Sequence, residues 1–199
     1  DFSHKIFFII RNEDEQNFGV KKFIEKIMKE KYTNKKFEIQ ILEKNTRGQA
    51  ETVLCCKKEI DNDRPLVIFN NDTYFKSTRL KSRLLSMKNQ NIDGILGIFN
   101  ANDPKYSFVE IDNEGIVVRT KEKEVISNFA STGLYVFSKG SDFVKSAEYV
   151  IERNILSKNE FYISELYNFL IKNGKKFTID FADEFAALGT PEDIKKFEA

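Results

Sequence analysis

The sequence predicts an α/β fold, a three-layer sandwich with a mixed, mainly parallel central sheet and a small β-rich subdomain. Short apolar runs alternate with helical patterns in the first half, which is typical of parallel strands covered by helices on both faces. Hairpin signals in the second half indicate a mixed sheet with a lid or substrate subdomain. A chain of 199 residues can bury a real core, so we expect one domain over residues 1–199.

Periodicity locates the elements of the first half. Continuous or alternating apolar runs predict four strands, at residues 6–10, 37–42, 65–69 and 94–99. Apolar residues at helical spacing predict three helices, at residues 18–31, 49–60 and 78–88. This order of strands and helices is the basis for the predicted parallel arrangement.

The second half contains the hairpin signals. Apolar runs predict four strands, at residues 108–111, 116–119, 132–137 and 177–181. The polar residues 112–115, which end in a glycine, predict the turn between the first two. Helices are expected at residues 142–152 and 163–172, and Thr190 and Pro191 are typical of the N-cap and first position of a last helix.

Charge and apolar patterning limit the classes of partner. The chain has 32 basic and 31 acidic residues, a net charge of +1, so bulk attraction gives no reason to expect a nucleic acid or a membrane. A small anionic ligand remains compatible with this balance. No apolar stretch is long enough to span a membrane and no signal peptide opens the chain. With free thiols, these features predict a cytoplasmic protein.

Cysteine and histidine are too few for several kinds of site. Cys55 and Cys56 are adjacent and lie in an apolar run, so we expect two buried thiols and no disulfide. His4 is the single histidine, and there is no CxxC pattern. A structural zinc site and a catalytic pair that needs histidine are therefore not expected.

Asp72 follows a buried apolar strand directly, as the end of the run 70–72. Ligands of such sheets bind at the carboxyl ends of strands. An aspartate there can be an ordinary turn or capping residue, or it can hold Mg²⁺ with waters and phosphate oxygens.

Two further polar segments have a structural and a functional interpretation. Residues 46–50 can form a turn with a capping box from Thr46 to Gln49, or a backbone cradle in which Gly48 allows close approach to a nucleotide base. Within the charge run 121–124, Glu122 and Lys123 can form a solvated face, or they can contact sugar hydroxyls and a phosphate.

Together these segments resemble the sugar-phosphate nucleotidyltransferase family, which includes glucose-1-phosphate thymidylyltransferases and mannose-1-phosphate guanylyltransferases. The segments are LEKNTRGQA at 42–50, VIFNND at 67–72, DPKYSFVE at 103–110, EK at 122–123 with STGLYVF at 131–137, and LGTPED at 188–193. Each motif is modest alone, but their order and spacing span nearly the whole chain.

The resemblance implies a Rossmann-like fold and an Mg²⁺-dependent reaction. In that reaction a sugar 1-phosphate oxygen attacks the α-phosphorus of a nucleoside triphosphate and pyrophosphate leaves. Residues of about 1–100 would bind the nucleotide and about 101–199 the sugar phosphate. The implied roles are Asp72 as the catalytic metal ligand, Lys123 as the catalytic contact to the sugar phosphate, Glu43, Gly48 and Asn71 at the nucleotide, and Tyr106, Ser107, Glu122, Thr132 and Gly133 at the sugar.

The sequence departs from the family pattern in four places. The family begins with a strand, a G-x-G-x-R loop and a Pro-Lys pair that hold the triphosphate, and this sequence starts at what resembles the second strand. We expect this unit to be cut away, left unresolved, or supplied by a partner chain. Without it a strand edge is unpaired. The second metal-binding aspartate of the family is Ala187 here. Asn71 replaces the usual glycine, and Glu124 replaces the usual proline after the lysine.

Glu43 bears on the choice of base, because related uridylyl- and thymidylyltransferases tend to have glutamine at its position. An ionised carboxylate only accepts hydrogen bonds. Cytosine and guanine present amino donors, whereas uracil and thymine present mostly acceptors. We therefore expect CTP or GTP rather than UTP or dTTP, with a phosphorylated sugar or small alcohol as the second substrate; an oligomer is left open.

Two other functions compete with an enzyme of nucleotide-sugar or surface-polysaccharide precursor synthesis. A non-catalytic binding or regulatory module of the same fold is favoured by Ala187. A glycosyltransferase of related fold is less favoured, because those enzymes usually have Asp-x-Asp where this chain has Asn-Asn-Asp at 70–72. The presence of Asp72, Glu122 and Lys123 favours the nucleotidyltransferase.

Overall fold

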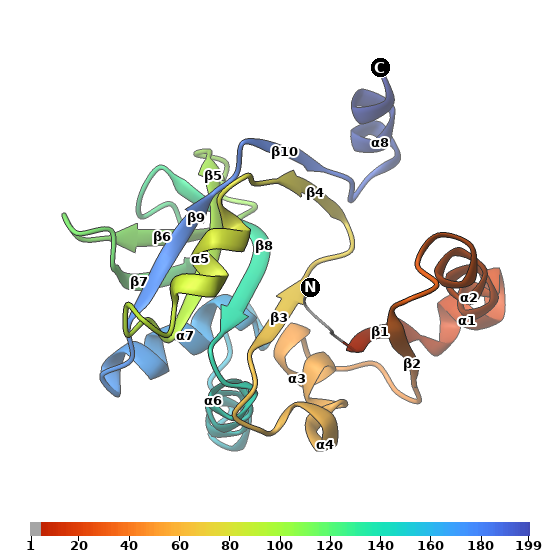
Figure 1. Ribbon diagram of the computed structural model, residues 1–199, viewed down its shortest axis with the longest axis horizontal. Coiled ribbons are helices and arrows are strands. Elements are labelled where there is room, and N and C mark those ends of the chain that lie inside the picture. Colours follow the sequence, from red (N-terminus) through yellow and green to blue (C-terminus); the bar gives the residue numbers. More distant parts are fainter. Residues whose placement is uncertain (1–4) are drawn as a thin grey trace.

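The computed structural model describes residues 5–199 (Figure 1). His4 lies outside the described residues. The strands are β1 (Lys5–Arg11), β2 (Lys36–Leu42), β3 (Leu66–Phe69), β4 (Thr73–Lys76), β5 (Gly94–Asn100), β6 (Ser107–Ile111), β7 (Val117–Glu122), β8 (Phe129–Phe137), β9 (Phe177–Phe181) and β10 (Glu184–Ala187). The helices are α1 (Asn12–Phe18), α2 (Val20–Lys31), α3 (Gln49–Leu54), α4 (Lys57–Ile60), α5 (Leu80–Ser86), α6 (Gly140–Glu152), α7 (Ile163–Lys172) and α8 (Pro191–Glu198).

The central sheet has six strands, in the order β7-β6-β8-β5-β9, with β3 also paired to β8. Both β3 and β5 run antiparallel to β8, and β9 runs parallel to β5. The strands β3, β5 and β9 therefore share one direction, and β8 runs against them between β3 and β5. This arrangement confirms the predicted mixed sheet, in which the neighbours β5 and β9 are parallel.

Apolar side chains cover both faces of this sheet. On one face α6 and α7 bury the larger core cluster, whose aromatic members include Phe137, Phe143, Tyr167 and Phe177. On the other face α5 covers a smaller cluster around Ile95 and Leu134. Figure 1 shows α5 in front of the sheet and α6 and α7 behind it. Each of the large buried side chains contributes roughly 1.5–3 kcal/mol by leaving water.

The strands β1 and β2 form a separate parallel pair that carries α1 and α2 (Figure 1). Within residues 5–199, β2 is the one sheet partner of β1, and β8 is the one sheet partner of β3. Val67 and Phe69 of β3 remain 50% and 43% exposed. The β1 side chains Phe7 and Ile9 pack against the larger core cluster, so side-chain contacts attach this pair to the rest. Each of β1 and β3 therefore has one edge without a strand partner among the described residues.

Most predicted elements are present, and the differences have local causes. The helix predicted at 18–31 begins at Asn12 and is interrupted by Gly19, whose φ is 62°. The helix predicted at 49–60 is divided at Cys55 and Cys56. Cys56 is buried as expected, and burial raises its pKa to about 11, but Cys55 is exposed.

The short strands β4 and β10 were not predicted. They pair with each other in antiparallel register, from Glu184 opposite Lys76 to Ala187 opposite Thr73. Each has only four residues, too short for an alternation to be recognised, and each gains its partner from a distant part of the chain. This pair connects the end of β3 to the segment that precedes α8.

The turn signal at residues 112–115 and the cap signal at Thr190 were accurate. The Gly115 N–H donates to the Asp112 carbonyl at 3.1 Å and closes the predicted hairpin turn. Thr190 is the N-cap of α8, and its hydroxyl accepts from the Asp193 N–H at 3.1 Å. These signals are local in sequence, which explains why they can be recognised without the fold.

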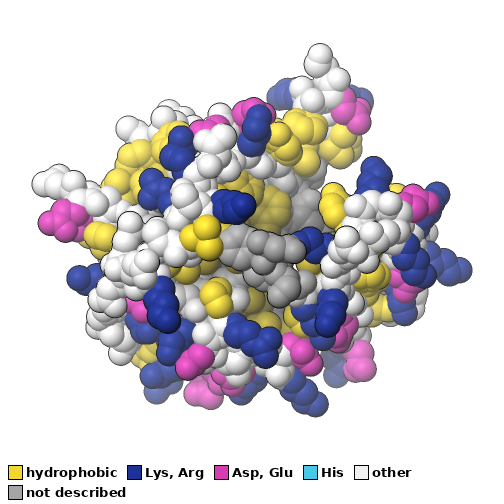
Figure 2. Space-filling model, in the orientation of Figure 1, with side chains coloured by type: hydrophobic (Ala, Val, Ile, Leu, Met, Phe, Trp, Pro, Cys, Tyr) yellow, Lys and Arg dark blue, Asp and Glu magenta, His cyan; other side chains and the backbone are white. Residues whose placement is uncertain are grey.

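The visible surface shows no single region of one charge. Figure 2 shows lysine and arginine side chains distributed over this face together with acidic ones. Across residues 5–199, no helix is both long and apolar enough to cross a bilayer.

An ion pair between a buried aspartate and a partly exposed arginine connects α5 to the sheet. Asp180 of β9 is 1% exposed, and its Oδ1 lies 3.3 Å from Nε of Arg83. Within the described residues neither carboxylate oxygen has a hydrogen-bond partner, so Arg83 is the group that offsets the buried charge. A buried charge that loses its partner is costly.

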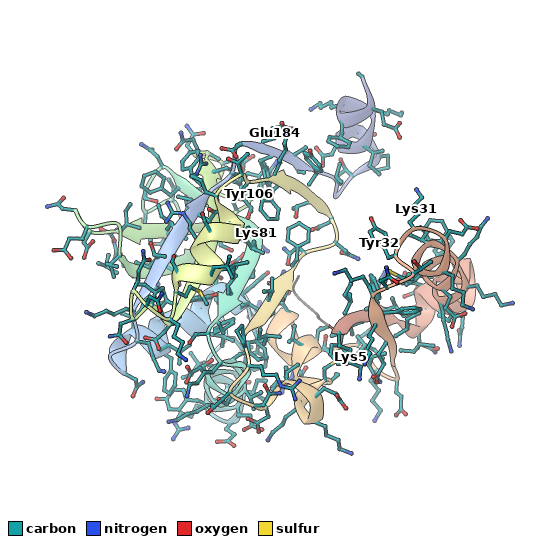
Figure 3. All side chains as sticks on the ribbon, viewed as in Figure 1. Lys5, Lys31, Tyr32, Lys81, Tyr106 and Glu184 are labelled. Atoms are coloured by element: carbon teal, nitrogen blue, oxygen red, sulfur yellow. The ribbon has the colours of Figure 1, made fainter. Side chains whose placement is uncertain are left out.

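We expect Arg83→Ala to lower the free energy of unfolding by about 2 kcal/mol, less than for a fully buried pair because the arginine is partly exposed. Urea denaturation measures the change. Lys81→Ala on the same helix is the matched control (Figure 3). Equal stability of the two variants would show that the pair does not stabilise the fold.

Candidate functional site

The turn after β2 is fixed to a distant segment around Gly48. The Phe161 N–H donates to the Arg47 carbonyl at 2.8 Å, and the Ala50 N–H donates to the Phe161 carbonyl at 2.9 Å. Gly48 has a φ of 132°, and a Cβ at this position would lie 2.6 Å from the Phe161 nitrogen. Glycine is required here because backbone atoms fill the space of a side chain. The close approach expected toward a base is thus made by Phe161, and contact between Gly48 and a nucleotide stays a prediction.

Asn70, at the end of β3, joins this turn to the central strand β8. The Gln49 Nε2 donates to the Asn70 Oδ1 at 3.2 Å, and the Asn70 N–H donates to the Gly133 carbonyl at 3.1 Å. Gly133 has a φ of 82°, and a Cβ there would lie 2.8 Å from the Asn70 side chain. The capping-box interpretation is wrong, because Gly48 is the N-cap and Gln49 reaches Asn70 instead of turning back to Thr46.

Asp72 is exposed and lies beside the segment that precedes α8. The Leu188 N–H donates to the Asp72 carbonyl at 2.7 Å, and a Cβ on Gly189 would be 3.7 Å from the carboxylate. Ala187 pairs with Thr73, so the position of the family's second metal aspartate is next to Asp72 and offers no oxygen. In the described part of the chain, no group of three acidic, histidine or cysteine side chains could hold a metal. A single carboxylate still suits Mg²⁺, which keeps several waters and binds phosphate oxygens.

Glu122 lies at the end of β7 and is only 5% exposed. Its Oε2 accepts hydrogen bonds from the hydroxyls of Ser107 and Ser164, the latter at 2.8 Å. Burial raises the pKa of the Glu122 carboxyl, and the two serine hydroxyls oppose that rise. The folded protein therefore holds this proton more tightly than the unfolded chain, so ionised Glu122 costs stability at neutral pH. A buried carboxylate kept at such a cost is typical of a functional site.

Lys123 adopts a backbone conformation that is unusual for a lysine, with a φ of 53°. Its N–H donates to the Tyr106 carbonyl at 3.0 Å, and its Nζ donates to the Tyr162 hydroxyl at 2.7 Å. The hydrogen bond to Tyr162 is the largest cause that raises the pKa of Lys123, so the amine stays protonated at neutral pH. These two hydrogen bonds hold the positively charged Lys123 side chain, which follows β7, against Tyr162 at the start of α7.

Tyr106 lies below β10 in the view of Figure 3, which also labels Glu184. Its ring meets Phe99 edge-on at 5.1 Å between centroids and lies 6.1 Å from Phe185. These aromatic contacts fix the hairpin that carries Ser107 and Lys123 against the β4–β10 pair.

The other predicted residues are less constrained or more deeply buried. Glu43 and Asn71 are both exposed, after β2 and β3 respectively. The Thr132 side chain is completely buried, and a Cβ on Gly97 would lie 2.4 Å from its Oγ1. Thr132 thus packs over Gly97, and its carbonyl accepts from the Thr73 hydroxyl at 3.1 Å. The ligand-binding roles of Glu43, Asn71 and Thr132 stay predictions.

Hydrogen bonds connect three segments that are far apart in sequence. Gln49, next to Gly48, contacts Asn70, which precedes Asp72 by two residues. Phe161, also held by the Gly48 turn, is followed by Tyr162, which holds Lys123. The Gly48 turn (residues 47–50), the Asp72 loop (residues 70–72) and Lys123 therefore belong to one connected cluster.

Sequence reasoning missed four residues of this cluster, namely Gln49, Asn70, Tyr162 and Ser164. Gln49 and Asn70 were within recognised segments, but their contact spans 21 positions and leaves no local pattern. Tyr162 and Ser164 flank the start of α7, where polar and aromatic residues next to a helix N-terminus could have drawn attention.

A family model described as nucleotidyl transferase matches residues 4–197. The chain belongs to this family. No curated protein sequence matches it significantly. Family membership confirms the resemblance drawn from the sequence motifs.

Solved structures of similar proteins span almost all of the chain. A nucleoside-diphosphate-sugar pyrophosphorylase from Vibrio cholerae RC9 is 28% identical, with a TM-score of 0.80 over 98% of this chain and 80% of that one. An inositol-1-phosphate CTP transferase from T. maritima is 14% identical, with a TM-score of 0.70 over 98% and 74%. A UDP-glucose pyrophosphorylase complexed with UDP-glucose is 17% identical, with a TM-score of 0.70 over 97% and 78%. The last two, which are more distant, support the nucleotidyltransferase fold.

Proposed function

We propose that the protein transfers a nucleoside monophosphate from a nucleoside triphosphate to a phosphorylated sugar or small alcohol. A phosphate oxygen of the acceptor forms a bond to the α-phosphorus, the bond between the α- and β-phosphates breaks, and pyrophosphate leaves. The observation that carries the proposal is the connected cluster of the Gly48 turn, the Asp72 loop and Lys123. Residues of about 1–100 would bind the nucleotide, and about 101–199 the acceptor.

In this proposal each residue has a role that follows from its chemistry. Asp72 would hold Mg²⁺, which when bound neutralises phosphate charge. Lys123 contributes a fixed positive charge to the acceptor phosphate. Glu122 and Ser107 would hydrogen bond acceptor hydroxyls, and Glu43 would accept from a base amino group. Catalysis would come mainly from positioning and charge neutralisation.

A second function is favoured by Ala187. With a single carboxylate at the predicted metal site, the fold could bind nucleotide without turnover. This candidate predicts nucleotide binding and no pyrophosphate release.

A pyrophosphate-release screen of the full-length protein separates these functions. It combines CTP, GTP, UTP and dTTP with glucose 1-phosphate, mannose 1-phosphate and phosphocholine, among other phosphorylated metabolites, in the presence of Mg²⁺. We expect release that requires both substrates and is faster with CTP or GTP than with UTP or dTTP, because Glu43 accepts hydrogen bonds only. Faster release with UTP or dTTP would refute the base preference. No release, with triphosphate binding by calorimetry, would support the binding module instead.

A further inference from the structure

The segment that precedes α7 contacts both parts of the candidate site. Phe161 is 1% exposed, and its backbone N–H and carbonyl are held on either side of Gly48. The guanidinium of Arg47 lies 4.8 Å from the centre of the Phe161 ring. The next residue, Tyr162, is 8% exposed, and its hydroxyl accepts from Lys123 at 2.7 Å. Two adjacent residues thus contact the Gly48 turn, which is proposed to bind the nucleotide, and Lys123, which is proposed to bind the acceptor phosphate.

The Lys123 amine needs such a partner because a lysine side chain has many conformers. Holding it in one conformer costs up to roughly 2 kcal/mol of entropy. The Tyr162 hydroxyl uses one of the three donors of the ammonium group and leaves two for phosphate oxygens. The Lys123 backbone is already fixed by its hydrogen bond to Tyr106. The side chain is therefore fixed at both of its ends.

We propose that Tyr162 is a positioning residue, which orients the Lys123 ammonium toward the acceptor phosphate and ties it, through Phe161, to the Gly48 turn. The proposal rests on the proposed function, and it assigns Tyr162 no direct contact with substrate. The Tyr162 ring is fixed because the residue is the N-cap of α7 and follows the backbone pairing of Phe161. Burial raises the pKa of Tyr162, so its hydroxyl stays neutral and able to accept from the lysine.

Tyr162→Phe removes the hydroxyl and keeps the ring. We expect the KM for the best acceptor of the screen to rise about tenfold, because a charge-assisted hydrogen bond is lost, with little change in kcat. Tyr149→Phe is the matched control, since Tyr149 is a tyrosine of α6 whose ring stacks on Phe169. Unchanged KM in Tyr162→Phe, relative to this control, would overturn the proposal.

A double-mutant cycle distinguishes positioning from a general structural effect. Lys123→Ala alone should raise the acceptor KM, and adding Tyr162→Phe to it should change KM by less than twofold. Independent, multiplicative effects of the two substitutions would overturn the proposal, because Tyr162 would then act without Lys123.

A separate readout covers the case in which the proposed reaction is absent. Calorimetric titration with inorganic phosphate measures the lysine site without turnover. Weaker phosphate binding by Tyr162→Phe than by Tyr149→Phe would support the positioning role even if the screen shows no release. Equal binding by the two variants would overturn it, whatever the outcome of the screen.

Discussion

Asp72→Ala is expected to reduce pyrophosphate release by about 10³-fold or more in the full-length protein, because it removes the carboxylate beside Gly189 that is proposed to hold Mg²⁺. The aspartate is exposed, and its backbone carbonyl, which alanine keeps, accepts the hydrogen bond from the Leu188 N–H. The thermal midpoint should therefore stay within the error of the unsubstituted protein. Steady-state release assays and thermal denaturation measure the two quantities.

Glu114→Ala provides the control for loss of a carboxylate. Glu114 is exposed in the hairpin turn after β6, where its backbone N–H, not its side chain, is held by Asp112. Normal release from Asp72→Ala at saturating Mg²⁺ would remove Asp72 from the reaction. Loss of both release and folding would instead indicate a structural role.

Gly48→Ala should lower the free energy of unfolding by about 3 kcal/mol. The new Cβ would meet the Phe161 backbone at 2.6 Å, and alanine disfavours the φ of 132°. The contact atoms are backbone and belong to the segment that holds Lys123, so the acceptor KM should rise as well. Urea denaturation and acceptor kinetics measure these effects together.

Gly19→Ala separates the two causes. Gly19 also has a positive φ, 62°, but nothing lies within 4 Å of the position of its Cβ. Gly19→Ala should lower the free energy of unfolding by only about 1 kcal/mol, which is the cost of a left-handed backbone conformation for an alanine. If both glycine variants lose the same stability, the close contact between Gly48 and Phe161 is not a source of strain.

The sequence predicted most elements because their signals are local. Apolar runs located β1, β3 and β5, and the stretch 163–172 was bounded correctly as α7. The β4–β10 pair could not be recognised, since each strand is defined by its partner more than 100 positions away. Cys55 and Cys56 show the same limit, because which of two adjacent thiols is buried depends on where the helix divides.

The candidate site was predicted in its parts and not in its connections. Asp72, Lys123 and Gly48 were each located by family motifs, but Tyr162, which joins Lys123 to the Gly48 turn, lies in no motif, and the motif that contains Asn70 does not indicate its contact with Gln49. Their importance comes from contacts across the fold, and a hydrogen bond between distant segments leaves no spacing to recognise. Thr132 shows the reverse, since a residue of a recognised motif is fully occupied in packing.

The proposed contacts to a ligand lie on two separate sheets. Within the described residues the β1–β2 pair shares no sheet hydrogen bonds with the six-stranded sheet, and Phe7 and Ile9 attach it through side-chain packing. Glu43 follows β2 directly, whereas Glu122 ends β7 of the six-stranded sheet and Lys123 follows it. The geometry between the proposed base contact and the proposed phosphate contact therefore depends on apolar packing between the two sheets.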